Sequence, residues 1–528
     1  MIYILAGWQP EITNLETDST LKMIEAFEQS NFEWRVLVPN FVPFLRYLLA
    51  EFRQSADDNF IKFYKQIQNI SDANVIPMVM DDLNLPSDVE KVYGRDQVLL
   101  LQNGQRFGEV YFNRFGYVKE VHYFKGEYVQ KDLFSDFGFI LSSTYLDQTN
   151  ELIERDYFDE KGQVVLTENS NGIRVDAVNQ DKFNRLFYAN MEDIYSEFLL
   201  KNLKHFDPRS DRLIVDGNSR QMMKVSQTFP YQEAIVYSYV DNHSQLTELK
   251  AIDYERLLAG KALVTDSLVK YQQLKLLNPL LALKGKVIPI FTSQLNLGAS
   301  NTVAEQFIYW RINRVDTEFE QLYKQVLSYL SKEAKIRLII DTPDANEITR
   351  LKDILATFIW QNSHIDVESE DYKLFDKYYT AMARGQITAA LQEEFELLKA
   401  SGEKFEEIKR SYEFYHVIQY RIKPDTETFQ NDLKQLRLYV NFRNDTNSFM
   451  QSMVLSSGVP ILSEYSSIYF VDNLNGKHLS KATDLLSALD FYLNGQNNWN
   501  KALVESVKQI EINGLAQAIE RWQEVLYG

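Results

Sequence analysis

The sequence predicts an α/β protein with two doubly wound domains, the first of them interrupted by an inserted antiparallel β domain. Short apolar strands alternate with helical segments over residues 1–97 and again over 183–280, which is typical of a parallel sheet covered on both faces. Between them, residues 98–182 show the two-residue alternation and glycine-containing turns of an antiparallel meander. A second α/β run covers residues 281–505, and residues 506–528 are predicted to be a C-terminal helix.

The first α/β run is predicted from apolar segments of strand length. MIYILAGW at residues 1–8 and WRVLVPN at residues 34–40 have the composition of buried strands, with a helix over residues 21–28 between them. The same pattern returns after the insertion, with predicted strands RLIVDG, EAIVYSYV and ALVTDS at residues 212–217, 233–240 and 262–267. These segments indicate one Rossmann-like domain that the insertion divides.

The inserted segment contains a weak internal repeat. The pattern Tyr-Phe-x-x-x-Gly-x-Val begins at Tyr111 and again at Tyr157. Its glycines, Gly116 and Gly162, are expected at hairpin turns, where a positive φ costs glycine little. Two copies are too few for a solenoid or a propeller, so the segment is predicted to be an inserted β domain.

Aromatic residues are concentrated in this insertion. From residue 111 to residue 158, 13 of 48 residues are aromatic, against 13% for the whole chain. Cross-strand pairing would account for part of this enrichment. A thin sheet, however, cannot bury every ring, and exposed rings mark protein contacts. The candidate partner interface is therefore placed at Tyr117, Tyr123, Tyr128 and Phe139.

The second α/β run is predicted to be another Rossmann-like domain. Its first strand is expected in VIPIF at residues 287–291. The later strands are expected in IRLIIDTP, RLYVNF and VPIL, at residues 336–343, 437–442 and 459–462.

Composition and charge exclude several classes of function. The formal net charge of -18 disfavours nucleic acid as a partner. The chain has no cysteine, which excludes disulfides and thiolate chemistry and fits a reducing compartment. The long apolar stretch at residues 274–291 contains three lysines and is not expected to span a bilayer. We expect a cytoplasmic protein that contacts a membrane only through partners, at most at the inner face of the cell membrane.

Common catalytic and cofactor motifs are missing from the sequence. It has no G-x-G-x-x-G, no phosphate-binding Walker loop, no G-x-S-x-G and no H-E-x-x-H. The six histidines are not at metal-ligand spacing. His243 follows a predicted strand, where α/β folds place active sites, but it is more simply interpreted as a structural loop residue. We expect no cofactor and no metal.

The segment LKQLRLYVNFRNDTNSFMQSMVLSSGVPIL, residues 433–462, resembles the strand, loop, helix, Gly-x-Pro and strand of the GT-B glycosyltransferases. The resemblance implies two Rossmann-like domains in a GT-B-like arrangement. It places the paired acids of a retaining enzyme at Asp445 and Met453. The implied sugar-nucleotide cleft is vestigial and contains Asp445, Ser448, Met453 and Gly458.

Three departures from that resemblance indicate lost catalysis. Met453 offers only a weakly accepting thioether where active relatives bind the donor ribose. Side chains at residues 446–448 replace a glycine-rich loop, so Asp445 is better explained as a helix cap than as a catalyst. Residues 287–310, expected to contain and follow the first strand of the second domain, have no lysine or arginine to bind a diphosphate. We therefore predict no enzymatic activity.

The whole chain, including the YFDEKGQVVLTEN segment, resembles the first accessory secretory protein of the accessory Sec system of Gram-positive bacteria. The resemblance implies a non-catalytic role in export of a serine-rich-repeat glycoprotein adhesin. It also implies a complex with other accessory secretory proteins and the accessory Sec motor ATPase. Two alternatives remain open: a stabilising subunit of the adhesin's O-linked N-acetylglucosamine transferase, and an active GT-B glycosyltransferase with another acid pair.

Overall fold

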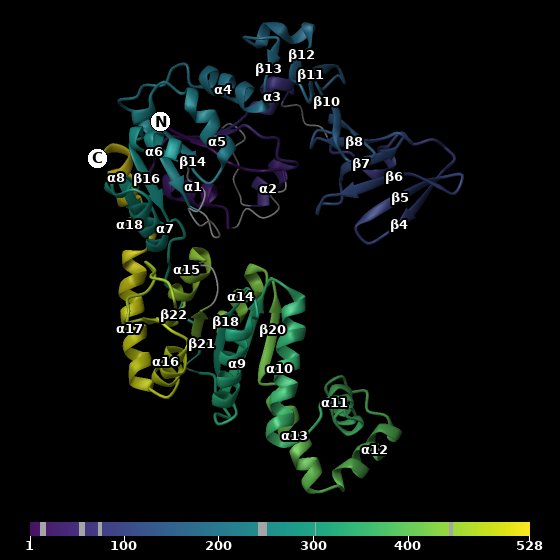
Figure 1. Ribbon diagram of the computed structural model, residues 1–528, viewed down its shortest axis with the longest axis vertical. Coiled ribbons are helices and arrows are strands. Elements are labelled where there is room, and N and C mark those ends of the chain that lie inside the picture. Colours follow the sequence, from purple (N-terminus) through teal and green to yellow (C-terminus); the bar gives the residue numbers. More distant parts are fainter. Residues whose placement is uncertain (11–16, 52–58, 72–75, 241–250, 301, 443–446) are drawn as a thin grey trace. The chain divides into compact units, whose positions relative to one another are not determined.

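The computed structural model describes residues 1–10, 17–51, 59–71, 76–240, 251–300, 302–442 and 447–528 (Figure 1). These residues form a ten-stranded antiparallel sheet and two parallel sheets of seven and six strands. The predicted fold class is therefore confirmed. The chain divides into two compact units, the first of Met1–Thr265, Gln273–Ile290 and Arg521–Gly528, and the second of Asp266–Gln272 and Phe291–Glu520.

The seven-stranded parallel sheet lies in the first unit and has the order β17-β16-β15-β14-β1-β2-β3. Its inner strands are continuous apolar runs, and all five residues of β15 are buried, as expected for a sheet covered on both faces. The strands are β1 (Ile2–Leu5), β2 (Trp34–Val38), β3 (Phe60–Lys62), β14 (Arg212–Asp216), β15 (Ile235–Tyr239), β16 (Ala262–Thr265) and β17 (Gly285–Val287). The predicted strands of the first α/β run are confirmed.

The helices of the first unit include α1 (Ser19–Gln29), which confirms the helix predicted over residues 21–28. Asp18 is its N-cap and accepts a hydrogen bond from the Leu21 N–H at 2.9 Å. The other helices along this part of the chain are α2 (Leu45–Glu51), α3 (Phe63–Gln68), α4 (Met191–Asn202), α5 (Arg220–Val225), α6 (Ala251–Ala259), α7 (Leu268–Leu277) and α8 (Pro279–Lys284).

The strand predicted at residues 287–291 is wrong. Val287 is the last residue of β17, which pairs with β16 at the edge of the first parallel sheet. Residues 288–291 are not in a strand, although Ile288, Ile290 and Phe291 are buried. Burial of a connecting segment requires the same apolar residues as a strand, and this similarity explains the error.

The inserted sheet runs in sequence order from β4 to β13 and is antiparallel throughout its described pairs. It extends from Val89 to Tyr188, beyond both ends of the predicted 98–182 segment. Gly116 (φ 83°) and Gly162 (φ 76°) have positive φ at turns, as predicted. The strands are β4 (Val89–Tyr93), β5 (Gln97–Gln102), β6 (Gln105–Phe112), β7 (Val118–Phe124), β8 (Tyr128–Phe134), β9 (Ile140–Asp147), β10 (Leu152–Phe158), β11 (Val164–Asn169), β12 (Gly172–Val175) and β13 (Phe187–Tyr188).

The inserted sheet shares its hydrophobic core with the rest of the first unit. Leu166 of β11 and Val175 of β12 belong to the same buried cluster as Phe63 of α3 and Leu199 of α4. The Gln68 amide also donates to two backbone carbonyls of the inserted sheet. Strands β11 and β12 are thus part of the core of the first unit, whereas β4 to β8 have a separate small core.

The six-stranded parallel sheet lies in the second unit and has the order β20-β19-β18-β21-β22-β23. Its strands are β18 (Gln306–Arg311), β19 (Ile336–Thr342), β20 (Ile418–Ile422), β21 (Leu436–Asn441), β22 (Ile461–Ser463) and β23 (Gly476–His478). The strands predicted at residues 336–343, 437–442 and 459–462 are confirmed by β19, β21 and β22.

The second unit is rich in helices, and a helical excursion of α11 to α13 separates α10 from β20. The helices along this part of the chain are α9 (Thr317–Leu330), α10 (Ala345–Ser363), α11 (Glu370–Ala383), α12 (Ala389–Lys399), α13 (Glu403–Tyr415), α14 (Thr426–Leu433), α15 (Ser448–Ser456), α16 (Thr483–Leu493), α17 (Gln496–Ile512) and α18 (Leu515–Tyr527). The last part of α18, from Arg521 on, belongs to the first unit. The predicted C-terminal helix over residues 506–528 is thus the end of α17 followed by α18. In the part of the chain that the structure describes, no helix combines the length and apolarity needed to cross a membrane.

Candidate functional site

The carboxyl edge of the second parallel sheet is the expected position of a ligand-binding site. Open parallel sheets bind ligands beyond the carboxyl ends of their strands, where the strand order reverses. Here the order reverses between β18 and β21, because β19 and β20 lie on one side of β18 and β21 to β23 on the other. Arg311 is the last residue of β18 and Asn441 is the last residue of β21.

Arg311 is the cation that β18 brings to this edge, and it faces a buried acid. Its Nε lies 3.8 Å from Oδ2 of Asp341 on the neighbouring strand β19. Its guanidinium also contacts the Met450 sulfur on α15. Burial raises the pKa of Asp341, and the Arg311 charge opposes that effect. The positive charge of Arg311 is therefore compensated inside the protein.

Basic residues do follow the first strand of the second sheet, so the expectation that they are absent is wrong. That expectation referred to residues 287–310, which end before β18 does. Arg311 closes β18, and Arg314 lies exposed in the following loop. The edge therefore carries basic residues, but the charge of Arg311 is already paired with that of Asp341.

A buried carboxylate lies at the N-terminus of α15. Asp266 is fully buried, and its Oδ1 lies 2.9 Å from Nζ of Lys270, which is also buried. Burial raises the pKa of Asp266, while Lys270 and the Ser448 side chain act in the opposite direction. Ser448 is the first residue of α15, so this carboxylate lies where the helix dipole favours an anion.

Asn447 is the N-cap of α15. Its side chain accepts a hydrogen bond from the Met450 N–H at 2.9 Å. Asp445 and His243 lie outside the described residues, so the interpretation of Asp445 as a helix cap stays a prediction.

The other residues of the expected cleft lie along α15 and just beyond its end. Ser448 is at the start of α15, Met453 is half-buried and packs against an apolar cluster, and Gly458 follows the end of the helix. Gly458 has φ 72°, and a Cβ there would lie 2.4 Å from Cδ1 of Leu503 on α17. Its glycine is thus explained by helix termination and close packing, without a ligand.

The residues that define this edge were not found from the sequence. Asp266 and Lys270 stand four residues apart immediately after the predicted strand ALVTDS, and an acid at the end of a strand is a usable signal. Arg311 was missed because the first strand of the second domain was placed too early. Asp341 gave a comparable signal at the end of IRLIIDTP.

The corresponding edge of the first sheet has acidic character. A cavity of about 290 Å³ lies between the ends of β1 and β14, and Gly7, Asp18 and Asp216 are among its lining residues. A Cβ at Gly7 would lie 2.1 Å from Oδ2 of Asp216, so only glycine leaves room for that carboxylate. The Trp8 indole N–H donates to Oδ2 of Asp18 at 2.8 Å. Two carboxylates make this cavity unsuitable for a phosphate group.

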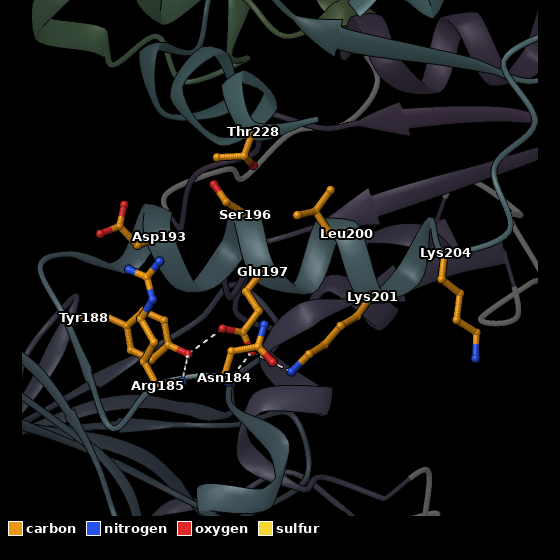
Figure 2. Close-up of a pocket in the computed structure, with 10 residues that line it drawn as sticks. All are labelled: Asn184, Arg185, Tyr188, Asp193, Ser196, Glu197, Leu200, Lys201, Lys204 and Thr228. Carbon is orange, nitrogen blue, oxygen red and sulfur yellow. Dashed lines mark hydrogen bonds and ion pairs between the residues drawn. The ribbon is translucent and has the colours of Figure 1, made fainter. Parts of the chain in front are cut away.

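A larger cavity of about 710 Å³ lies beside α4 and the segment leading into β13 (Figure 2). Its central group is the Glu197 carboxylate, toward which the Tyr188 hydroxyl and the Lys201 ammonium point in Figure 2. The backbone N–H of Asn184 donates to the same carboxylate at 2.9 Å. Burial and the hydrogen bond to Glu197 raise the pKa of Tyr188. Glu197 thus makes hydrogen bonds and an ion pair within the protein.

The four aromatic residues of the expected partner interface are half-buried and pack on other rings. Tyr117 stacks on Phe44 of the α/β body with centroids 6.2 Å apart. The other three pairs are Tyr123 with Phe107, Tyr128 with Tyr145, and Phe139 with Phe137. More exposed rings lie on the two edge strands, at Tyr93 (68%) of β4 and Phe187 (53%) of β13.

Comparison with known proteins identifies relatives over the whole chain. A family model of the accessory Sec system, that of its first accessory secretory protein, matches residues 4–527. The protein of that description from Streptococcus gordonii is 24% identical over 527 residues, which are 98% of this chain and 94% of the relative.

Solved structures show the same architecture. A chain of the Glycosylation Associate Protein (Gap123) complex from Streptococcus agalactiae is 21% identical with a TM-score of 0.73, over 99% of this chain and 100% of that chain. The pneumococcal O-GlcNAc transferase GtfA, in complex with UDP and GlcNAc, is 13% identical with a TM-score of 0.65, over 100% of this chain and 99% of that one. These likenesses establish a GT-B-like fold.

Proposed function

The chain belongs to the family of the first accessory secretory protein of the accessory Sec system, and from this membership we propose that it is a non-catalytic component of that export machinery. The family match over residues 4–527 is the observation that carries the proposal. The chain would act within a complex of accessory secretory proteins. Its similarity in fold to a chain of the Gap123 complex supports such an assembly.

The charge arrangement at the second sheet supports the absence of transferase activity. Transfer from a sugar nucleotide releases a diphosphate, whose developing charge needs uncompensated cations or helix N-termini. Arg311 is paired with Asp341, and the buried Asp266 carboxyl, itself paired with Lys270, already lies beside Ser448 at the N-terminus of α15. A donor diphosphate at this edge would meet a compensated arginine and a helix N-terminus that a carboxyl group of the protein already occupies.

The proposed cargo and downstream partner are those that the resemblance to this family implies. We infer that the complex delivers a glycosylated serine-rich-repeat adhesin to the accessory Sec motor ATPase at the inner face of the cell membrane. A transferase-like fold without transfer would suit that role, because it could recognise a sugar-bearing chain without altering it.

A second candidate is a stabilising subunit of the transferase that glycosylates the adhesin, favoured by the fold similarity to the O-GlcNAc transferase GtfA. Deletion of the gene in the native host separates the two. Loss of an export component leaves a glycosylated adhesin inside the cell, whereas loss of a transferase subunit leaves an unglycosylated one. Lectin blots of cytoplasmic and surface fractions make the distinction, and surface adhesin at the wild-type amount would contradict both.

A further inference from the structure

The first strand of the inserted sheet, β4, is an open edge. It is at one end of the ten-strand order, and β5 is its only partner strand among the residues that the structure describes (Figure 1). Four of its five residues are exposed, including Val92 (48%) and Tyr93 (68%). Exposed strand edges present unpaired backbone groups to other chains, and proteins ordinarily cover them or protect them with proline or charged side chains. Strand β4 has no proline, and its charged residues are Glu90 and Lys91.

The backbone groups available at this edge can be assigned from the ladder. The Gly94 N–H donates to the Gln97 carbonyl at 2.9 Å, and antiparallel strands alternate in the direction of their hydrogen bonds. The N–H and C=O groups of Lys91 and Tyr93 therefore point away from β5. The Val89 N–H, which also points away, is already bonded to the Pro86 carbonyl. Lys91 and Tyr93 thus offer two donors and two acceptors to an added strand.

The opposite edge of the same sheet does not have this property. Its last strand, β13, contains only two residues, and the side chain of Tyr188 is buried against Glu197 of α4. Helix α4 therefore covers part of that edge. Of the two edges, β4 is the one suited to accept another strand.

The charge of Lys91 limits which strand can be added. A second copy paired antiparallel over all five residues would place Lys91 opposite Lys91 of that copy, which is unfavourable. The present partner of Lys91 is Asp81, at 3.7 Å, and the Asp81 side chain is 92% exposed, so this ion pair is weak and replaceable. An acidic residue opposite Lys91, between residues that pack on Val89 and Tyr93, would be favourable.

We propose that β4 is a docking edge for an extended segment of a partner protein. The segment adds one strand to the inserted sheet and has an acidic residue opposite Lys91, between two apolar residues. The inference rests on the proposed function, because it requires a partner in the accessory complex. It places the contact at an edge strand instead of at Tyr117, Tyr123, Tyr128 and Phe139.

The test uses the full-length chain and the two other accessory secretory proteins of the native host, mixed and measured by biolayer interferometry. In Lys91→Pro the substitution removes an outward N–H and no bond of the β4–β5 ladder. In Lys91→Glu the charge is reversed. Both are expected to bind roughly tenfold or more weakly, with an unchanged circular dichroism spectrum. Lys161→Glu, with the same charge change in an exposed turn of the same sheet, should bind like the wild type.

The outcomes separate this inference from the proposed function. Wild-type affinity in both Lys91 variants overturns the docking edge and leaves the proposed function intact. Absence of binding by the wild-type chain overturns the proposed function, and with it the partner that the edge requires. A dimer of the wild-type chain that Lys91→Pro dissolves would assign the edge to a second copy and would also overturn the inference.

Discussion

Substitution of Asp266 or Lys270 tests whether the two side chains form a buried ion pair at the carboxyl edge of the second sheet. The side chains are 1% and 5% exposed, and Oδ2 of Asp266 has no hydrogen-bond partner among the described residues. In Lys270→Met the carboxylate remains buried without its cation. Removing one partner of such a pair typically costs about 3–5 kcal/mol, much more than an exposed pair is worth.

The double variant Asp266→Asn, Lys270→Met is the matched comparison. Because it removes both charges, it should be more stable than Lys270→Met alone, with a gain of about 2 kcal/mol or more. Lys275→Met changes an exposed lysine of the same helix and should cost less than about 0.5 kcal/mol. Urea unfolding followed by tryptophan fluorescence measures these differences, since Trp310 and Trp499 are buried in the second unit.

The pH dependence of the free energy of unfolding tests the same pair independently. The pKa of Asp266 is raised in the folded protein, so its stabilising contribution is fully present below the unfolded pKa of about 3.9 and is lost as the pH rises through the folded value. The free energy of unfolding of the wild type, relative to Asp266→Asn, should therefore decrease from pH 4 to pH 7. An equal cost for Lys270→Met and Lys275→Met, or a flat pH profile, would refute the buried pair at the start of α15.

Three further predictions concern the helix cap, the insertion and the aromatic contacts. Asn447→Ala should lower the free energy of unfolding by about 0.5–2 kcal/mol because it removes the N-cap of α15, and an unchanged urea midpoint would contradict this. Deletion of residues 98–174 should give aggregated protein, because Leu166 and its neighbours belong to the shared core; a monodisperse product in size-exclusion chromatography would show that the core is separable. Tyr117→Ser should destabilise the chain by about 1–3 kcal/mol through loss of the contact with Phe44 and leave partner affinity unchanged, whereas weaker binding without destabilisation would restore Tyr117 to the interface.

Local patterns predicted most of the fold. Strands such as RLIVDG and IRLIIDTP are continuous apolar runs because the parallel sheets are buried on both faces, and this signal needs no tertiary information. The exception is VIPIF, because a buried connection has the same composition as a buried strand. The extent of the inserted sheet was underestimated because β4 has almost no buried residue and thus no alternation to detect.

The candidate site was much harder to predict. The pairing of Arg311 with Asp341 depends on which strands are neighbours, and the place of Asp266 beside Ser448 joins residues far apart in the chain. Single-sequence patterns contain neither fact. The half-burial of Tyr117 likewise depends on Phe44 of another element. Composition identified an aromatic insertion, but only the tertiary contacts show which of its rings pack on other rings of the chain.

The most direct test of the central claim is recovery of the tagged, full-length chain from its native host, followed by quantitative mass spectrometry of the proteins bound to it. We expect enrichment of the other accessory secretory proteins and, at lower amounts, of the motor ATPase and the glycosylated adhesin. Purified wild-type chain from the same preparation should neither transfer nor hydrolyse sugar nucleotides. Enrichment of a glycosyltransferase without accessory secretory proteins, or sugar transfer by the pure chain, would contradict the account.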